Sequence, residues 1–233
     1  MSEFPSLEVV DRSGAIREAA EAAGVDRRDF LRKGAVAGGG IVAGSAFFGI
    51  LTSAEAAIST KKKSKRNDVK ILQFAMTLEL LEANFYRQAR DNKVFGDDAP
   101  LERFTRTVSA HEDDHVTFLS NALGNKRVSG LQFDFGDTVT NRDKFKATAQ
   151  VLEDTGVKAY LGQAGNIKQT PVLEAAGSIV TVEARHASWI RFINGGGAPT
   201  ADTASLPAPR TFDDADTERQ ILRAVGATGF IQS

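Results

Sequence analysis

The sequence contains no cysteine, and neither acidic nor basic residues dominate it. Without cysteine the chain can form no disulfide, no thiolate active site and no iron–sulfur cluster, so any bound metal must have nitrogen and oxygen ligands. A formal net charge of −1 gives no reason to expect nucleic acid or an anionic membrane as a partner. No long alternating strand pattern is present either, although "LQFDFGDTV" could be locally extended. The lack of an alternating strand pattern leaves helices as the expected secondary structure.

The first 56 residues have the layout of an export signal. A basic cluster containing Arg27 and Arg28 precedes a weakly apolar run over 34–52, and "AEA" at 54–56 offers the small residues of a cleavage site. The paired arginines followed by "DFL" resemble the twin-arginine (Tat) consensus. The resemblance implies recognition by the Tat export machinery, a route that carries folded proteins, often with a cofactor already inserted.

The alternative is that the apolar run remains as a membrane anchor, since its length is close to that needed to span a bilayer. Six glycines between 34 and 49 make it a poor anchor. We therefore expect cleavage after residue 56 and no stable membrane insertion afterwards. The mature protein would reside in the periplasm, in the cell envelope or outside the cell.

The rest of the chain is predicted to form one helical domain with a tail. A polar linker covers 57–66, a bundle covers 67–194, and an irregular extension that ends in a short helix covers 195–233. Apolar residues at three- and four-residue spacing predict four helices within the bundle. Their expected ranges are 67–91, 99–123, 142–164 and 170–194.

The four helices form an internal repeat. In the first and third helices a glutamate precedes a tyrosine by seven residues, and these are the only tyrosines in the chain. The second and fourth helices each carry Glu-x-x-His within an apolar stripe. The repeated residues are Glu79 with Tyr86, Glu153 with Tyr160, Glu112 with His115, and Glu183 with His186. The chain therefore resembles two copies of one helical hairpin joined by a crossover.

The repeated residues have the chemistry of a metal site. Residues three apart on a helix lie on one face, so the Glu and His of each pair can reach one ion or a close pair of ions. Four buried carboxylates would be costly without compensation, whereas two divalent cations balance four negative charges. Carboxylate and imidazole ligands suit Fe(II), Mn(II) or Zn(II).

The order Glu, Glu-x-x-His, Glu, Glu-x-x-His resembles the ferritin-like di-iron carboxylate proteins. The strings "TLELLEANFYRQA", "HEDDH", "LEDTGVKAYLGQA" and "VEARHASWIR" are similar to small exported bacterial ferritin-like domain proteins. This resemblance implies an antiparallel four-helix bundle that holds two iron ions, with manganese or zinc as alternatives. It makes Glu79 and Glu153 terminal ligands. The bridging ligands would be Glu112 and Glu183, with one nitrogen each from His115 and His186.

The resemblance also places Tyr86 and Tyr160 where such proteins often have a redox-active or supporting phenol. It implies oxidation of Fe(II), or reaction with O₂ or H₂O₂, in protection from oxidative stress. Two alternatives remain open: a non-catalytic envelope protein stabilised by metal, and a peroxidase resembling dimanganese catalase. Whether the protein is an enzyme stays undecided by the sequence, which also allows an oligomer.

Several residues near the motifs have two interpretations. Glu82 could replace Glu79 as a ligand, but only Glu79 has the tyrosine spacing of the repeat. His111 forms His-x-x-x-His with His115, although the fourth helix has no counterpart, so we interpret His111 as peripheral. Gly156 is either a close-packing contact or a local bulge. Asp113 and Asp114 are expected to be solvated.

Overall fold

A computed structural model of the chain describes residues 57–197 and 206–232. Four long helices account for most of this part: α5 (Lys65–Asp91), α6 (Ala99–Leu123), α7 (Arg142–Ala164) and α8 (Thr170–Asn194). The predicted all-α bundle is confirmed, and the first helix begins two residues earlier than expected. The predicted export signal lies outside the described residues and stays a prediction.

The helices begin where the sequence supplies capping groups. The Ser64 and Asp98 side chains accept hydrogen bonds from the first turns of α5 and α6, and Asn141 does the same for α7. Gln169 precedes α8 without capping it by its side chain, but the buried Asp68 carboxylate accepts hydrogen bonds from the Lys168 and Gln169 amides. A residue of α5 thereby fixes the start of α8.

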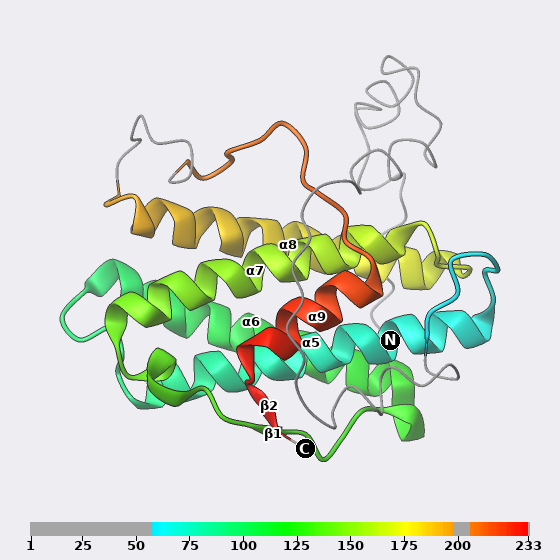
Figure 1. Cartoon of the computed structure of the whole chain (residues 1–233), viewed down its shortest axis with the longest axis horizontal. Helices are drawn as coiled ribbons and strands as arrows, with labels where there is room; N and C mark the ends of the chain where they lie inside the picture. Colours follow the sequence, from blue (N-terminus) through cyan, green and yellow to red (C-terminus); the bar gives the residue numbers. More distant parts are fainter. Residues whose placement is uncertain (1–56, 198–205, 233) are drawn as a thin grey trace.

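The helices are arranged as two hairpins (Figure 1). In one hairpin α5 packs along α6, and in the other α7 packs along α8, while contacts of α5 with α7 and of α6 with α8 close the bundle. The crossover between the hairpins runs through two short 3₁₀ helices, η1 (Gly124–Lys126) and η2 (Gly136–Val139), with strand β1 (Gln132–Phe133) between them. No helix in the described ranges is long and apolar enough to cross a membrane.

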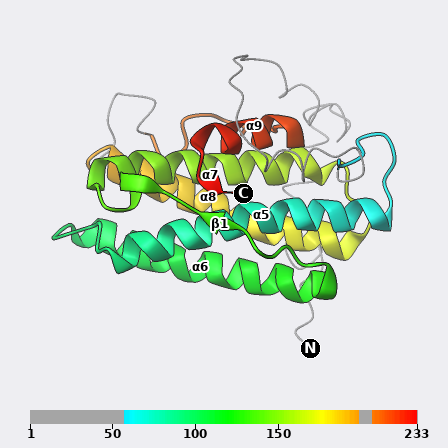
Figure 2. The same ribbon diagram turned by 60° about the horizontal axis from the view of Figure 1, so that its bottom comes forward.

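The described part of the C-terminal extension is more ordered than its composition suggests. Helix α9 (Glu218–Thr228) lies over α7 (Figure 2), and strand β2 (Ile231–Gln232) pairs antiparallel with β1 in the crossover. The Asp216 carbonyl oxygen would be 1.8 Å from a Cβ on residue 162, so Gly162 permits the tail to approach α7. The tail therefore binds both the second hairpin and the crossover.

The core is apolar at both ends of the bundle and charged in between. Phe85 stacks on Phe145 with ring centroids 5.3 Å apart, and both rings are completely buried. A second apolar cluster, which includes Met76, Leu119 and Ile179, lies on the opposite side of the charged residues along the helix axes. The charged residues between these clusters lie in an interior that apolar side chains shield from water.

Candidate metal centre

The structure brings all six predicted ligands together in the middle of the bundle. Each of the four long helices contributes a glutamate, and α6 and α8 also contribute a histidine three residues later, which regular helical geometry puts on the same inward face. The ligand atoms form two groups, and within each group all atoms lie within 4.8 Å of one another. The groups are Glu79, Glu112, His115 and Glu183, and Glu112, Glu153, Glu183 and His186.

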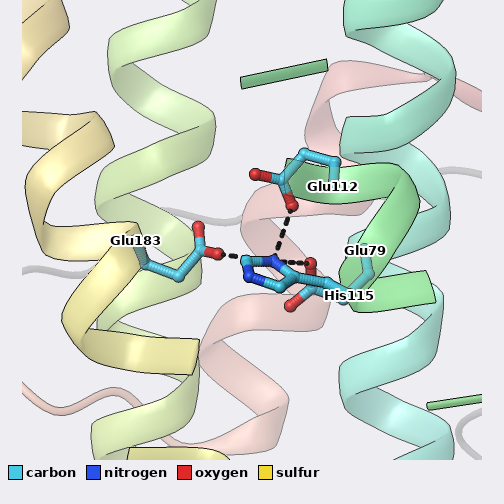
Figure 3. Close-up of side chains that lie close together, drawn as sticks. All are labelled: Glu79, Glu112, His115 and Glu183. Carbon is cyan, nitrogen blue, oxygen red and sulfur yellow. Dashed lines mark hydrogen bonds and ion pairs between the residues drawn. The ribbon is translucent and has the colours of Figure 1, made fainter. Parts of the chain in front are cut away.

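The first group surrounds the ring of His115 (Figure 3). Its Nδ1 atom lies 3.1 Å from Glu79 Oε2, 3.2 Å from Glu112 Oε2 and 3.1 Å from Glu183 Oε1. The carboxylates come from three different helices and converge on one nitrogen. Three carboxylate oxygens and one imidazole nitrogen are a suitable ligand set for a divalent transition metal.

The second group repeats this arrangement around His186. Its Nδ1 atom lies 3.1 Å from Glu112 Oε1, 3.2 Å from Glu153 Oε2 and 3.9 Å from Glu183 Oε2. Glu112 and Glu183 thus each present one oxygen to one histidine and the other oxygen to the other histidine. This geometry fits shared ligands between two positions, with Glu79 and Glu153 belonging to one position each.

The two tyrosines connect the hairpins at the site. Tyr86 of α5 donates a hydrogen bond to Glu153 Oε1 of α7, and Tyr160 of α7 donates one to Glu79 Oε1 of α5 at 2.5 Å. Each phenol therefore holds the glutamate of the opposite hairpin and leaves the other oxygen of that glutamate facing a histidine. The hydroxyl group of each tyrosine hydrogen-bonds to a predicted ligand and does not reach the space between the ligands.

Buried polar atoms without partners show that the protein alone does not complete this cluster. Within the described part of the chain, seven buried side-chain nitrogen or oxygen atoms lack a hydrogen bond of acceptable geometry, and six of them are here, although some lie within 3.1 Å of each other. They are Glu82 Oε1, Glu112 Oε1, Glu153 Oε2, both carboxylate oxygens of Glu183, and His186 Nδ1. Leaving such groups unpaired is costly, and bound cations would satisfy them. The residues present therefore fit a pair of metal ions.

Burial and mutual repulsion hold protons in the metal-free cluster. Burial raises the pKa of Glu112 to about 7, with the neighbouring Glu79 carboxylate adding to the increase. Burial alone would lower the pKa of His186, but the Glu153 and Glu112 carboxylates raise it to about 10. Burial and the Glu112 charge also raise the pKa of Glu183 well above its usual value. Protons thus take the place of cations as the positive charge in the site.

His111 lies closer to the site than the sequence analysis predicts. Its Nδ1 atom is 2.8 Å from His186 Nε2, and the two rings stack with centroids 5.1 Å apart. If His186 is to offer Nδ1 to a metal, its proton must be on Nε2, where it is donated to His111. The His-x-x-x-His spacing places His111 on this side of α6, but no sequence signal indicates its contact with α8.

The other ambiguous residues are resolved by their surroundings. Gly156 lies within the regular helix α7 with the Glu82 and Glu183 carboxylates against it, so it is a close-packing position and not a bulge. Glu82 is 97% buried beside the site but belongs to neither ligand group. Asp114 is exposed, whereas Asp113 is half-exposed and pairs with Arg87 at 2.5 Å.

A helical bundle with a buried carboxylate–histidine cluster defines a class of metal-binding proteins. Comparison with protein-family models agrees with this class, because residues 67–196 match the ferritin-like domain. The match covers more than half of the chain, and the protein therefore belongs to the ferritin-like domain family. A comparison with curated proteins found no match.

The pKa shifts predict how the stability of the metal-free protein depends on pH. Between pH 4.5, the ordinary pKa, and about 7, the folded protein keeps a proton on Glu112 that the unfolded chain releases. The free energy of unfolding of the metal-free protein should therefore fall as pH rises through this window. Urea melts at several pH values in the presence of a chelator would measure this fall.

Glu112→Gln is the matched control, because an amide cannot titrate. It should reduce the slope in this window but not abolish it, because burial also raises the pKa of Glu183 and of Glu82 well above the usual value. Asp114→Asn on the exposed face should leave the slope unchanged. The same slope in Glu112→Gln and wild type would show that Glu112 is not the group responsible.

The contact between His111 and His186 predicts an indirect effect on metal binding. His111→Ala removes the acceptor for the His186 Nε2 proton, and we expect metal affinity to fall about 10-fold, the lower end for lost partners of metal ligands. His111→Asn offers an amide oxygen in its place and should retain most of the affinity. Competition with a chromophoric chelator measures both. If His111→Ala loses all metal while His186→Ala binds normally, the ligand assignment is wrong.

Proposed function

We propose that this protein holds two iron ions and uses them to oxidise Fe(II) with O₂ or H₂O₂, in protection from oxidative stress. The observation that carries the proposal is the pair of ligand groups that share Glu112 and Glu183. Two adjacent positions with shared carboxylates suit chemistry on a diatomic oxidant, because both oxygen atoms can be near an ion. The choice of iron over manganese or zinc is supported by resemblance to di-iron carboxylate proteins.

The proposed roles of the residues follow from their contacts. Glu79 with His115 would hold one ion and Glu153 with His186 the other, while Glu112 and Glu183 would bind both. When bound, two ferrous ions supply two electrons, which with two protons reduce H₂O₂ to two water molecules or O₂ to H₂O₂. Tyr86 and Tyr160 keep their protons at the phenol oxygens, because burial and the adjacent carboxylates raise the pKa of both well above 10.

The surroundings of the site support reaction away from bulk water. All four glutamates are at most 1% exposed, and the side chain of His115 is 13% exposed. Electrostatic interactions between ligands and ions are stronger in such an interior than in water. His115 and His111 are the partly exposed residues of the site and both belong to α6, and we propose that O₂ or H₂O₂ approaches on that side.

Metal content and turnover test this proposal together. Protein loaded with Fe(II) under anaerobic conditions should contain two iron ions per chain by elemental analysis. After O₂ or H₂O₂ is added, absorbance should show Fe(II) oxidation faster than for the same iron free in buffer. Replacing both Glu112 and Glu183 with Ala should abolish both results, whereas replacing both Asp113 and Asp114 with Ala should change neither.

Other outcomes separate the alternatives. Two metals per chain without turnover above free metal would indicate a metal-stabilised, non-catalytic protein. Manganese in protein purified from its native host, with O₂ released from H₂O₂, would indicate a catalase-like activity. Chains that take up no metal under any of these conditions would overturn the dinuclear centre itself.

We further propose that the protein works outside the cytoplasm after export by the twin-arginine route. The order of basic cluster, apolar run and small residues in 27–56 supports this location. Replacing Arg27 and Arg28 with Lys should leave the uncleaved precursor in the cytoplasm, because the export machinery reads the arginine pair. Fractionation and N-terminal sequencing measure this, with Arg12→Lys plus Arg17→Lys as the control. Normal export of the Arg27/Arg28 variant would exclude the route.

A further inference from the structure

Helices α5 and α7 repeat the site residues except at one position. Three residues after its ligand, α5 has Glu82, and α7 has Gly156 at the equivalent place after Glu153. Four residues later both helices have the tyrosine that reaches across to the opposite hairpin. The site therefore contains one carboxylate that has no counterpart in the repeat.

Gly156 leaves room beside this extra carboxylate. A Cβ on residue 156 would make an ordinary contact with Glu82 Oε1 at 3.6 Å and a tight one with Glu183 Oε2 at 3.3 Å, so a side chain longer than that of alanine would displace both oxygens. The α7 backbone is helical through Gly156 and does not require glycine for its conformation. Because glycine weakens a helix interior relative to alanine, its presence here is best explained by the carboxylates that it admits.

Glu82 is directed into the site without a partner for one of its oxygens. The side chain is 3% exposed, and Oε1 has no hydrogen-bond partner. This oxygen lies on the same side of Gly156 as Glu183, which belongs to both ligand groups. When it is ionised, a buried carboxylate in this position needs a positive partner, because the nearest residues from α7 and α8 are themselves acidic.

The extra charge changes the balance of the cluster. Four carboxylates compensate two divalent cations, so a fifth leaves one negative charge in excess. That excess is removed when one of the two ions carries a third positive charge. A fifth carboxylate therefore favours the oxidised state of an iron pair over the fully reduced state.

We propose that Glu82 is a further ligand of the dinuclear centre, which makes the two ion positions unequal and stabilises the oxidised state. The proposal rests on the proposed function, since it requires a bound pair of redox-active ions. Gly156 serves it by leaving room for the Glu82 carboxylate beside Glu183. The effect of Glu82 is on the reduction potential of the ions, not on whether the bundle folds.

The test compares Glu82→Gln with wild-type protein, both loaded with two iron ions per chain. The amide keeps the size of the side chain and removes its charge, so the variant should bind two iron ions and be easier to reduce. At a fixed potential the ratio of oxidised to reduced centre should fall about tenfold, equivalent to about 59 mV for a one-electron couple. A redox titration followed by electron paramagnetic resonance measures the ratio. Mössbauer spectra of the reduced proteins should show two iron environments that become more alike in the variant.

Matched variants make each outcome decisive. Asp114→Asn removes an exposed carboxylate from α6 and should leave the potential unchanged. If Glu82→Gln does not fold, Glu82→Met replaces the buried carboxylate with an apolar chain of similar length, and the same rise in potential is expected. Wild-type potential and spectra in a folded, iron-loaded Glu82 variant would overturn the proposal and leave the dinuclear centre in place. A wild-type protein that binds no iron pair would instead overturn the proposed function, and this proposal with it.

Discussion

Negative charge inside an apolar bundle is the constraint on which the site and its surroundings depend. Glutamates from four helices converge between two apolar clusters, where the protein supplies too few hydrogen-bond donors for their oxygens. Desolvation of this kind costs several kcal/mol per ion unless positive charge compensates it. The two imidazoles and two phenols orient the carboxylates but do not neutralise them all. Bound cations would supply the missing positive charge.

The repeat made most of the site predictable from the sequence. The Glu-x-x-His pairs identify the inward faces of α6 and α8, and the Glu–Tyr spacing selects Glu79 over Glu82 on α5. Because helical periodicity fixes which residues share a face, the helix boundaries and the cluster of six side chains agree closely with the structure. The identity of the metal, the reaction and export remain predictions, since none of them is determined by helix geometry.

What the sequence could not predict depends on contacts between helices. The spacing of Tyr86 and Tyr160 gives their face, but only packing decides that each phenol binds the glutamate of the other hairpin. The contact of His111 with His186 crosses from α6 to α8 in the same way. The pairing of β1 with β2 joins residues about a hundred positions apart, and two-residue strands carry no periodic signal. Side-chain direction across an interface is a property of the assembled bundle.

The crossed tyrosines have a consequence for how the site comes into existence. Neither hairpin can orient its own terminal carboxylate, because the phenol that does so belongs to the other hairpin. A chain in which only one half has folded would hold a flexible glutamate and an unoccupied hydroxyl, and no complete binding position. The complete cluster therefore forms only when the two halves assemble, and an incompletely folded chain would offer no complete position to a metal ion.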